Sequence, residues 1–403
     1  MKALLVAKSG GAFYTRAQAA KNSSSGEQGE TEGIIRHLAE RDDIRLIYFG
    51  RVYGDIPCEI FEPDINGFTE YTTVREQETH WDEDTCRMKD LLRGDELIGF
   101  VMTAGYSPTF SWVNNPNGAQ VQAASVRYQG PVLNILEQFE IPRIVVNNDP
   151  RTYPKDQEMS CGWKYARPAA LLDQCALDTH QVVGGKRYHR RSIWARPESW
   201  AYHLRGLPNT EVLNCVVIAH AHINDGCKQR KRNDSWANVL GGELPAGLQV
   251  WGNGWKAYEN YDPNIMLGTL RPNEVMALLN QTMSCPCVAA APGFYTGKVY
   301  VCEAQGCIPI LYGDGTDPYT WDPNGILEPL NSPYRVVKPG DLKRVVDLYR
   351  LNENLRVERR KFWSEATKAH WYYLDNVIND LVQGRDWTDD SWFQEYGGYR
   401  LDH

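Results

Sequence analysis

The chain has 403 residues, of which 42% are hydrophobic and 23% are charged, and its formal net charge is −8. This composition is typical of a soluble globular protein, and the length exceeds what one hydrophobic core usually organises, so we expect two domains. The sequence contains no apolar stretch long enough to span a membrane. Its first residues, MKALLVA, predict a buried strand rather than a signal peptide. We therefore expect a cytoplasmic protein with no membrane partner.

Ten cysteines are scattered along the chain, and only Cys285 and Cys287 are closely spaced. No second pair stands at the spacing of a zinc site, so we expect free thiols in a reducing compartment. His220 and His222 alternate at strand spacing and share one face, but no third ligand stands near them. We therefore expect no metal site.

The first half of the chain alternates predicted strands with predicted helices. A strand over residues 1–7 is followed by a loop of about 20 residues, which is a length typical of functional loops. Helices are predicted near 31–41 and 130–140, and the further strands are 44–50, 97–104 and 142–148. Strands that alternate with helices predict a mainly parallel sheet. We assign residues 1–208 to this first domain and regard 190–210 as the connector to the next.

The same alternation restarts after residue 209. Apolar segments predict strands over residues 212–222, 247–254, 264–270, 286–292 and 308–311, with a helix after Pro272. Residues 340–382 are predicted to form one long, charged helix. We assign 209–370 to a second domain and 371–403 to a helical tail that returns toward the first. The predicted fold class is α/β, with two Rossmann-like doubly wound domains facing a cleft, and ligands bind such sheets outside the carboxyl ends of their strands.

The segment PGFYTGKVYVCEAQG (292–306) predicts a glycine-bearing turn that leads into a short helix over 298–305. Free backbone N–H groups at such a turn can bind an anion. Glu303 could accept hydrogen bonds from the two hydroxyls of a ribose. The alternative is an ordinary helix that precedes a core strand, with Glu303 solvated. The candidate donor-binding residues here are Gly293, Thr296, Gly297, Lys298 and Glu303.

A basic run follows the first strand of the second domain and is predicted to be a loop at the carboxyl end of that strand. Arginine and lysine bind phosphates, so the run is a candidate diphosphate site, although a solvated loop would look the same. Its cations are Lys228, Arg230, Lys231 and Arg232.

Asp149 ends a first-domain strand, where a general base for an acceptor hydroxyl would lie. Asp55 is the other candidate for this general base. A turn before a proline is the alternative reading of Asp149. Gly10 and Gly11 follow the first strand and would allow a ligand to approach the backbone closely. No GxGxxG, GxxxxGK[ST], GxSxG or HExxH motif is present, which removes the main support for dehydrogenases, P-loop ATPases, common serine hydrolases and zincins.

Residues 183–205 are basic and contain interleaved aromatic side chains, in contrast to the acidic chain as a whole. Cations with aromatics suit a nucleic-acid backbone and an exposed base, but an inter-domain connector would explain the same composition. The candidate acceptor-binding residues are Lys186, Arg187, Arg190, Arg191, Trp194 and Arg196.

The run Glu303-Ala-Gln-Gly-Cys-Ile-Pro-Ile310 resembles the E-A-x-x-x-G-x-P-V region of GT-B glycosyltransferases, shortened between the glutamate and the glycine. The resemblance implies that Glu303 binds the donor ribose, that residues 228–232 bind the donor diphosphate, and that Ser9–Gly11 is the glycine loop of the first domain. It further implies a metal-independent transferase that needs no cofactor and uses a nucleotide-diphosphate sugar, most simply a UDP-sugar.

Within GT-B enzymes the chain is most similar to bacteriophage DNA glucosyltransferases, which modify hydroxymethylated pyrimidines. Residues 143–149 resemble the strand end that carries the aspartate base in those enzymes. This resemblance implies a DNA acceptor, a monomer, and the host cytoplasm as the location if the protein is viral. A small-molecule or cell-envelope acceptor and a nucleotide-sugar epimerase remain as alternatives.

Overall fold

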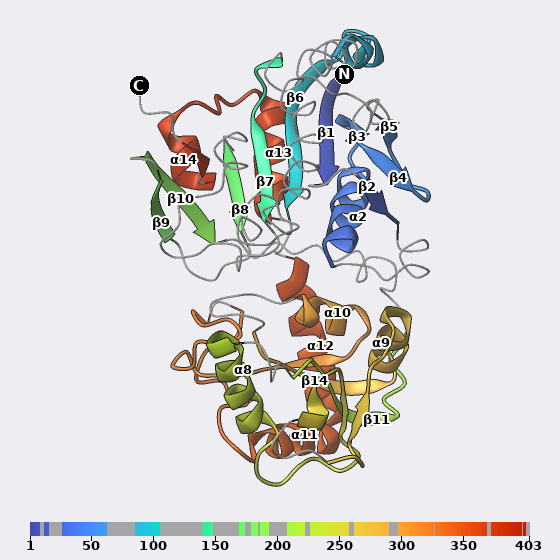
Figure 1. Ribbon diagram of the computed structural model, residues 1–403, viewed down its shortest axis with the longest axis vertical. Coiled ribbons are helices and arrows are strands. Elements are labelled where there is room, and N and C mark those ends of the chain that lie inside the picture. The colour runs from blue at the N-terminus through green and yellow to red at the C-terminus, as the bar shows by residue number, and fades with distance from the viewer. Residues whose placement is uncertain are drawn as a thin grey trace. The chain divides into compact units, whose positions relative to one another are not determined.

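The computed structural model (Figure 1) divides the chain into two compact units, of which unit 1 comprises Met1–Ser199 with Trp371–His403 and unit 2 comprises Trp200–His370. Unit 1 is therefore discontinuous in sequence, and its last part follows unit 2 along the chain. The boundary expected after residue 208 lies instead between Ser199 and Trp200. The structure describes residues 1–8, 12–15, 26–62, 85–104, 139–147, 169–173, 179–183, 186–192, 208–221, 226–257, 262–289, 297–325, 327–368, 372–396 and 398–399.

The sheet of unit 1 is parallel through its centre. Its strands are β1 (Lys2–Lys8), β3 (Ile44–Phe49), β5 (Glu59–Phe61), β6 (Glu96–Ala104), β7 (Arg143–Asn147) and β8 (Ala170–Asp173). They lie in the order β5-β3-β1-β6-β7-β8, and each neighbouring pair is parallel. Counted along the chain, this is the order 3-2-1-4-5-6 of a doubly wound fold.

The edge of this sheet beyond β8 is formed by a strand whose last residues, from residue 190, were predicted to belong to the inter-domain connector. β10 (Lys186–Ser192) pairs parallel with β8 and antiparallel with β9 (Thr179–Val183) and β16 (Gly398–Tyr399). The connector expected to begin at residue 190 is wrong at its start, because Ser192 still pairs with Asp173 of β8. A separate small sheet joins β2 (Ala12–Tyr14) to β4 (Arg51–Tyr53).

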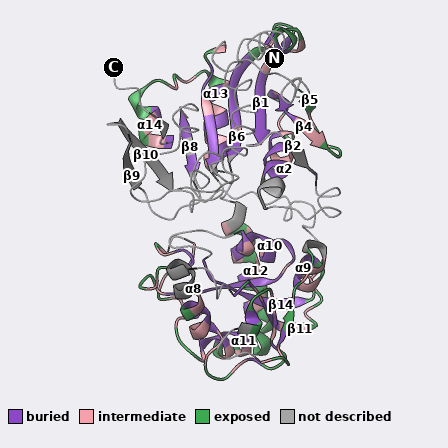
Figure 2. Cartoon of the chain, viewed as in Figure 1, coloured by how far each residue is buried: buried purple, intermediate pink, exposed green. Residues whose placement is uncertain are grey.

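Both faces of the unit 1 sheet are buried, which explains why its strands read as continuous apolar runs. On β1, Leu4 and Val6 pack into one core cluster, and Ala3 and Leu5 pack into another. The first cluster includes α2 (Gly26–Leu38), α13 (Tyr372–Gln383) and α14 (Asp390–Tyr396), and the second includes the helix at 85–92. Figure 2 shows the central strands coloured as buried. The C-terminal helices thus complete the core of unit 1.

Unit 2 contains a second parallel sheet in the order β13-β12-β11-β14-β15. Its strands are β11 (Leu213–Ile218), β12 (Gln249–Trp251), β13 (Met266–Gly268), β14 (Thr282–Cys287) and β15 (Ile308–Leu311). Its helices are α8 (Gly226–Val239), η2 (Trp255–Ala257), α9 (Pro272–Leu279), α10 (Lys298–Ala304), α11 (Asp341–Leu351) and α12 (Glu353–Lys368). The order along the chain reverses between β11 and β14, so the switch point of this sheet lies there.

Two local predictions are wrong. Residues 228–232 lie in the first turns of α8 rather than in a loop. The segment 340–382 does not form one helix, because Asn352 takes an extended conformation (φ −134°, ψ 97°) that ends α11 before α12 begins at Glu353. The predicted fold class is confirmed as two doubly wound α/β units with helices at the C-terminus. No helix within the described ranges is long and apolar enough to cross a bilayer.

Candidate functional site at the carboxyl edge of the unit 2 sheet

The chain continues in register beyond the carboxyl ends of β11 and β12. The Ala219 N–H donates to the Trp251 carbonyl at 2.9 Å, and the Ala221 N–H donates to the Asn253 carbonyl at 2.8 Å. His220, which is exposed, accepts a hydrogen bond on Nδ1 from the Asn253 N–H at 2.9 Å. These contacts hold the backbone beyond the switch point in a fixed position.

Two glycines allow this close approach. Gly252 has φ 145°, and a Cβ atom there would lie 1.6 Å from the Ala219 carbonyl oxygen. Gly254 has φ 85°, and its Cβ would lie 1.9 Å from the Ala221 oxygen. Any side chain at either position would collide with backbone, in a conformation that L-residues rarely adopt. The two glycines of the sequence Trp-Gly-Asn-Gly-Trp (251–255) are therefore required by the geometry of this edge.

A cation lies at the switch point itself. Lys298 is the first residue of α10, and its ammonium group donates a hydrogen bond to the carbonyl of Ile218, the last residue of β11. Its Nζ also lies 5.7 Å from the centre of the Trp236 ring, within the range of a cation–π interaction. Lys298 thus places a positive charge at the edge where doubly wound sheets bind ligands.

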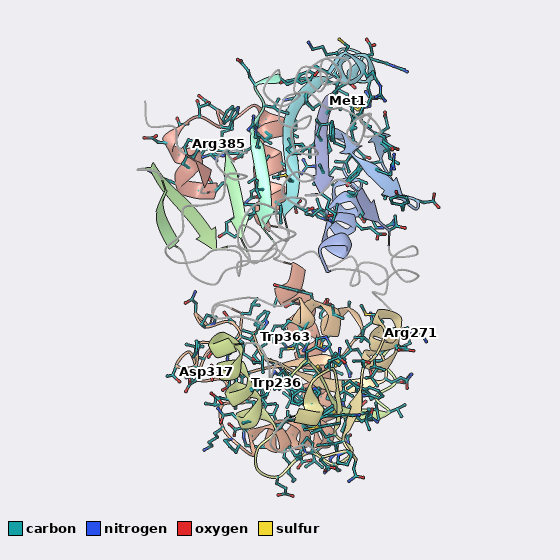
Figure 3. The ribbon with its side chains drawn as sticks, viewed as in Figure 1. Met1, Trp236, Arg271, Asp317, Trp363 and Arg385 are labelled. Atoms are coloured by element: carbon teal, nitrogen blue, oxygen red, sulfur yellow. The ribbon has the colours of Figure 1, made fainter. Side chains whose placement is uncertain are left out.

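Two buried tryptophans support this cation. Trp236 of α8, labelled in Figure 3, meets Trp255 of η2 edge-to-face, with ring centroids 6.0 Å apart and an interplanar angle of 80°. The Trp255 indole N–H donates to the Ala219 carbonyl at 2.9 Å. The pair therefore joins α8 to the end of β11. Sequence reasoning missed both residues, although the glycines around Asn253 gave a signal that the segment after β12 is special.

α10 begins at Lys298, as the sequence predicted, and ends at Ala304, one residue before the predicted end. Gly297 is its N-cap and is buried, Gln305 is its C-cap, and Gly306, with φ 66°, leads the chain into β15. Glu303 is half-buried in the last turn. With a rise of 1.5 Å per residue, Glu303 lies about 7.5 Å along the helix axis from Lys298. The predicted helix and strand are confirmed, whereas the role of Glu303 stays a prediction.

The segment after β15 is attached to α8 through Asp317, which Figure 3 labels. Its carboxylate accepts hydrogen bonds from Ser235 Oγ at 3.0 Å and from the Tyr312 hydroxyl at 2.6 Å. Asn238 Nδ2 donates to the same Tyr312 oxygen at 3.0 Å. Burial raises the pKa of Tyr312 to about 12, so the phenol remains a neutral donor at physiological pH. This network fixes α8 against the carboxyl edge.

The other predicted site residues fall into three groups. Asp55 is exposed and follows β4 of the small sheet, so it does not come directly after a strand of the main sheet. The basic residues Lys228, Arg230, Lys231 and Arg232 lie in α8, and Lys186, Arg187, Arg190 and Arg191 lie in β10. The candidates outside the described residues are Gly10, Gly11, Asp149, Trp194, Arg196, His222, Gly293 and Thr296.

Within the described part of the chain, no group of three or more His, Cys, Asp or Glu side chains is arranged to hold a metal ion.

No protein-family model matches the sequence, and no curated protein matches it. Solved structures with a similar fold include HepE from Anabaena in complex with UDP and glucose, which has a TM-score of 0.45 and 11% identity and is matched over 95% of this chain and 100% of that one. A trehalose-6-phosphate synthase has a TM-score of 0.45 and 10% identity, over 94% and 99%. The UDP-GlcNAc 2-epimerase from Neisseria meningitidis has a TM-score of 0.41 and 8% identity, over 96% and 100%. Likenesses at this level do not assign a function.

Proposed function

We propose that the protein is a glycosyltransferase of the GT-B type, and that its nucleotide-diphosphate sugar donor binds at the carboxyl edge of the unit 2 sheet. The observation that carries the proposal is the Lys298 ammonium group at the switch point, hydrogen-bonded to the end of β11. A donor diphosphate needs cations at this edge of a doubly wound sheet. The sequence from Glu303 to Ile310 adds support, because it resembles the donor motif of that family.

In the proposed reaction an acceptor oxygen attacks the anomeric carbon of the sugar, and the bond from that carbon to the diphosphate breaks. Negative charge develops on the leaving diphosphate, so a fixed cation such as Lys298 would stabilise the transition state. The cations of residues 228–232 would assist it, and Glu303 would hold the ribose. Asp149 would accept the proton of the acceptor hydroxyl. The reaction needs no metal ion in this scheme.

Donor binding is tested by thermal shift with UDP-, GDP-, ADP- and TDP-sugars. A ligand at 100 times its Kd stabilises the folded state by about 2.7 kcal/mol, and we expect the UDP-sugar to do so. Lys298→Met keeps the side-chain length and removes the charge, which should weaken binding roughly 10- to 100-fold. Lys361→Met is the matched control, because Lys361 lies in α12 of the same unit and is 77% exposed. A chain that no sugar nucleotide stabilises would contradict the proposal.

For the acceptor, we propose DNA that carries a hydroxymethylated base. The support is the basic and aromatic composition of residues 183–205, where the candidates run from Lys186 to Arg196. Binding through phosphates weakens steeply as salt is raised, with a slope proportional to the number of phosphates contacted. The test measures the affinity for DNA at salt concentrations between about 50 and 200 mM. Absent or salt-independent binding would favour a small-molecule or cell-envelope acceptor.

A further inference from the structure

His220 is an exposed side chain just beyond the carboxyl end of the first strand of the unit 2 sheet. β11 ends at Ile218, but Ala219 and Ala221 continue its hydrogen bonds to β12 and the chain that follows it. Both alanines are buried, whereas the imidazole between them is exposed. Successive side chains of an extended chain point to opposite faces. The backbone therefore presents the imidazole to solvent at the edge where doubly wound sheets bind ligands.

The imidazole is held by a backbone group. Its Nδ1 accepts a hydrogen bond from the Asn253 N–H at 2.9 Å. Asn253 stands between Gly252 and Gly254, and the close approach of both glycines to the carbonyls of residues 219 and 221 fixes the backbone around this N–H. Because glycine has no Cβ, residues 252 and 254 place no side chain over the ring. The ring is therefore anchored through one nitrogen and is exposed to solvent.

This hydrogen bond decides which nitrogen of the ring carries the proton. A neutral imidazole has one N–H and one acceptor nitrogen. Because Nδ1 of His220 accepts from the backbone, its Nε2 carries the proton and is a hydrogen-bond donor. A metal ion needs an unprotonated nitrogen, so this tautomer does not suit one at Nε2. The group that it suits is a hydrogen-bond acceptor, such as a phosphate oxygen.

A second donor lies on the same stretch of chain. The Lys298 ammonium donates to the carbonyl of Ile218, two residues before His220. An extended chain rises about 3.3 Å per residue, so the two donors are attached within about 7 Å of backbone. One of them is a point charge and the other is an oriented neutral N–H. Two donors of this kind at the switch point match a ligand that carries several anionic oxygens on neighbouring phosphates.

We propose that His220 is a donor-binding residue, which holds the diphosphate of the nucleotide sugar through its Nε2–H beside Lys298. The contact to a diphosphate rests on the function proposed above, whereas the tautomer of the ring does not. In the proposed reaction, charge grows on the diphosphate as its bond to the anomeric carbon breaks. A donor that is already oriented interacts more strongly with that growing charge and needs no reorganisation to do so.

The tautomer is tested by nitrogen NMR of the histidine rings in the intact protein. The spectrum of His220→Asn identifies the His220 signals, because only they disappear. We expect an unprotonated Nδ1 and a protonated Nε2 near neutral pH. A ring that is protonated on Nδ1, or that exchanges between both neutral forms, overturns the proposal, because Nε2 is then not a fixed donor.

The diphosphate contact is tested with the same variant. The amide oxygen of asparagine takes the place of Nδ1 and can accept from the Asn253 N–H, but asparagine has no donor at the position of Nε2. His220→Asn should therefore keep the melting temperature of the wild type and bind UDP about 10- to 100-fold more weakly. Its affinity for uridine, which carries no phosphate, should be unchanged. A ring that only satisfies the Asn253 N–H predicts no loss of UDP affinity.

Two further variants complete the test. His220→Gln places an amide N–H near the position of Nε2 and should recover part of the affinity for UDP. His37→Asn is the control, because it removes an imidazole that pairs with Asp375 in unit 1, and it should leave UDP binding unchanged.

Unchanged UDP affinity in His220→Asn, or an equal loss for UDP and uridine, overturns the diphosphate contact alone. A wild-type chain that binds neither UDP nor a UDP-sugar overturns the proposed function together with that contact, and the NMR result still decides the tautomer.

Discussion

The guanidinium group of Arg335 lies 3.3 Å from the carboxylate of Asp322, and both side chains are fully buried. Arg335 also donates to the carbonyls of Gly313 at 3.2 Å, Trp321 at 2.8 Å and Glu328 at 2.5 Å. One buried cation therefore satisfies backbone oxygens along the segment that follows β15. This segment reaches Asp317 and so helps to hold α8 at the carboxyl edge.

Removal of the Arg335 charge should strongly destabilise unit 2. Arg335→Met removes the cation beside the buried Asp322 carboxylate, which keeps its hydrogen bonds from the N–H groups of Leu327 and Glu328. It also removes the donor that several carbonyl oxygens share, and breaking one partner of a buried pair costs about 3–5 kcal/mol. The measurement is urea unfolding of the full chain, followed through its tryptophan fluorescence. Arg271→Met is the control, because Arg271 is 78% exposed and pairs with Glu274 at the surface. Equal effects of the two substitutions would contradict the importance of the buried pair.

Gly254, which follows β12, should not accept a side chain. Gly254→Ala places a Cβ 1.9 Å from the Ala221 carbonyl, so the switch-point backbone must move. Gly247 has a similar φ, 73° against 85°, but nothing lies within 4 Å of its Cβ position. Gly247→Ala should therefore cost only the conformational strain, about 1 kcal/mol, and Gly254→Ala several times more. Comparable melting temperatures for the two variants would show that the close approach is unimportant.

Trp392 should be essential to unit 1 although it lies near the end of the chain. Its indole N–H donates to the Ala169 carbonyl at 2.9 Å, and the side chain is fully buried in the core cluster. Trp392→Phe removes the donor and leaves a buried carbonyl unpaired, at a cost of about 1–3 kcal/mol. Trp387, which is half-buried at the edge of the same cluster, provides the control Trp387→Phe. The readout is the urea midpoint of unit 1.

Asp341 should make the stability of unit 2 depend on pH. Burial opposes its charge, but the N–H groups of Val337 and Lys338, each at 3.1 Å, and Arg344 at 3.2 Å outweigh burial and lower its pKa below 3.8. Because the folded state favours the ionised form, this stabilisation is present above pH 3.8 and is lost as the pH falls through the lower folded pKa.

Asp341→Asn should therefore be less stable than the wild type at pH 7, by about 1–3 kcal/mol. The difference in unfolding free energy should shrink as the pH falls below about 4, because the wild-type carboxylate becomes protonated there. Denaturant unfolding of the wild type and of Asp341→Asn, from pH 7 to below pH 4, measures this difference and its change with pH, within about the range that linkage covers. A difference that does not change with pH would show that the carboxylate charge is not the cause.

Most strands could be predicted because parallel strands buried on both faces are apolar runs, as in residues 44–49 and 213–218. β10 could not, because its sequence KRYHRRS has no apolar pattern and its place depends on pairing with β8. The break at Asn352 was also invisible, since neither proline nor glycine marks it. Propensity alone does not place such a break when packing of the flanking helices decides it.

The site was predicted in part. The glycines around Lys298 and Glu303 located α10 and β15, because glycine marks helix ends and tight turns. Trp236 and Trp255 could not be predicted to meet, since they are 19 positions apart and only the tertiary contact between α8 and η2 joins them. The basic run at 228–232 was expected in a loop, because its first helical turns carry no apolar stripe of their own.

The discontinuity of unit 1 has a consequence for how the chain is made. Residues 200–370 are contiguous, so unit 2 can complete its core as soon as they have left the ribosome. Unit 1 is translated first but lacks Val377 and Trp392, which belong to its core, until the last residues are added. Its nascent strands must therefore remain soluble with an uncovered apolar face throughout the synthesis of unit 2, a period of about 10–30 seconds at usual elongation rates. Folding during translation thus proceeds from the second unit to the first, and the early strands are the part of this protein with most need of a chaperone.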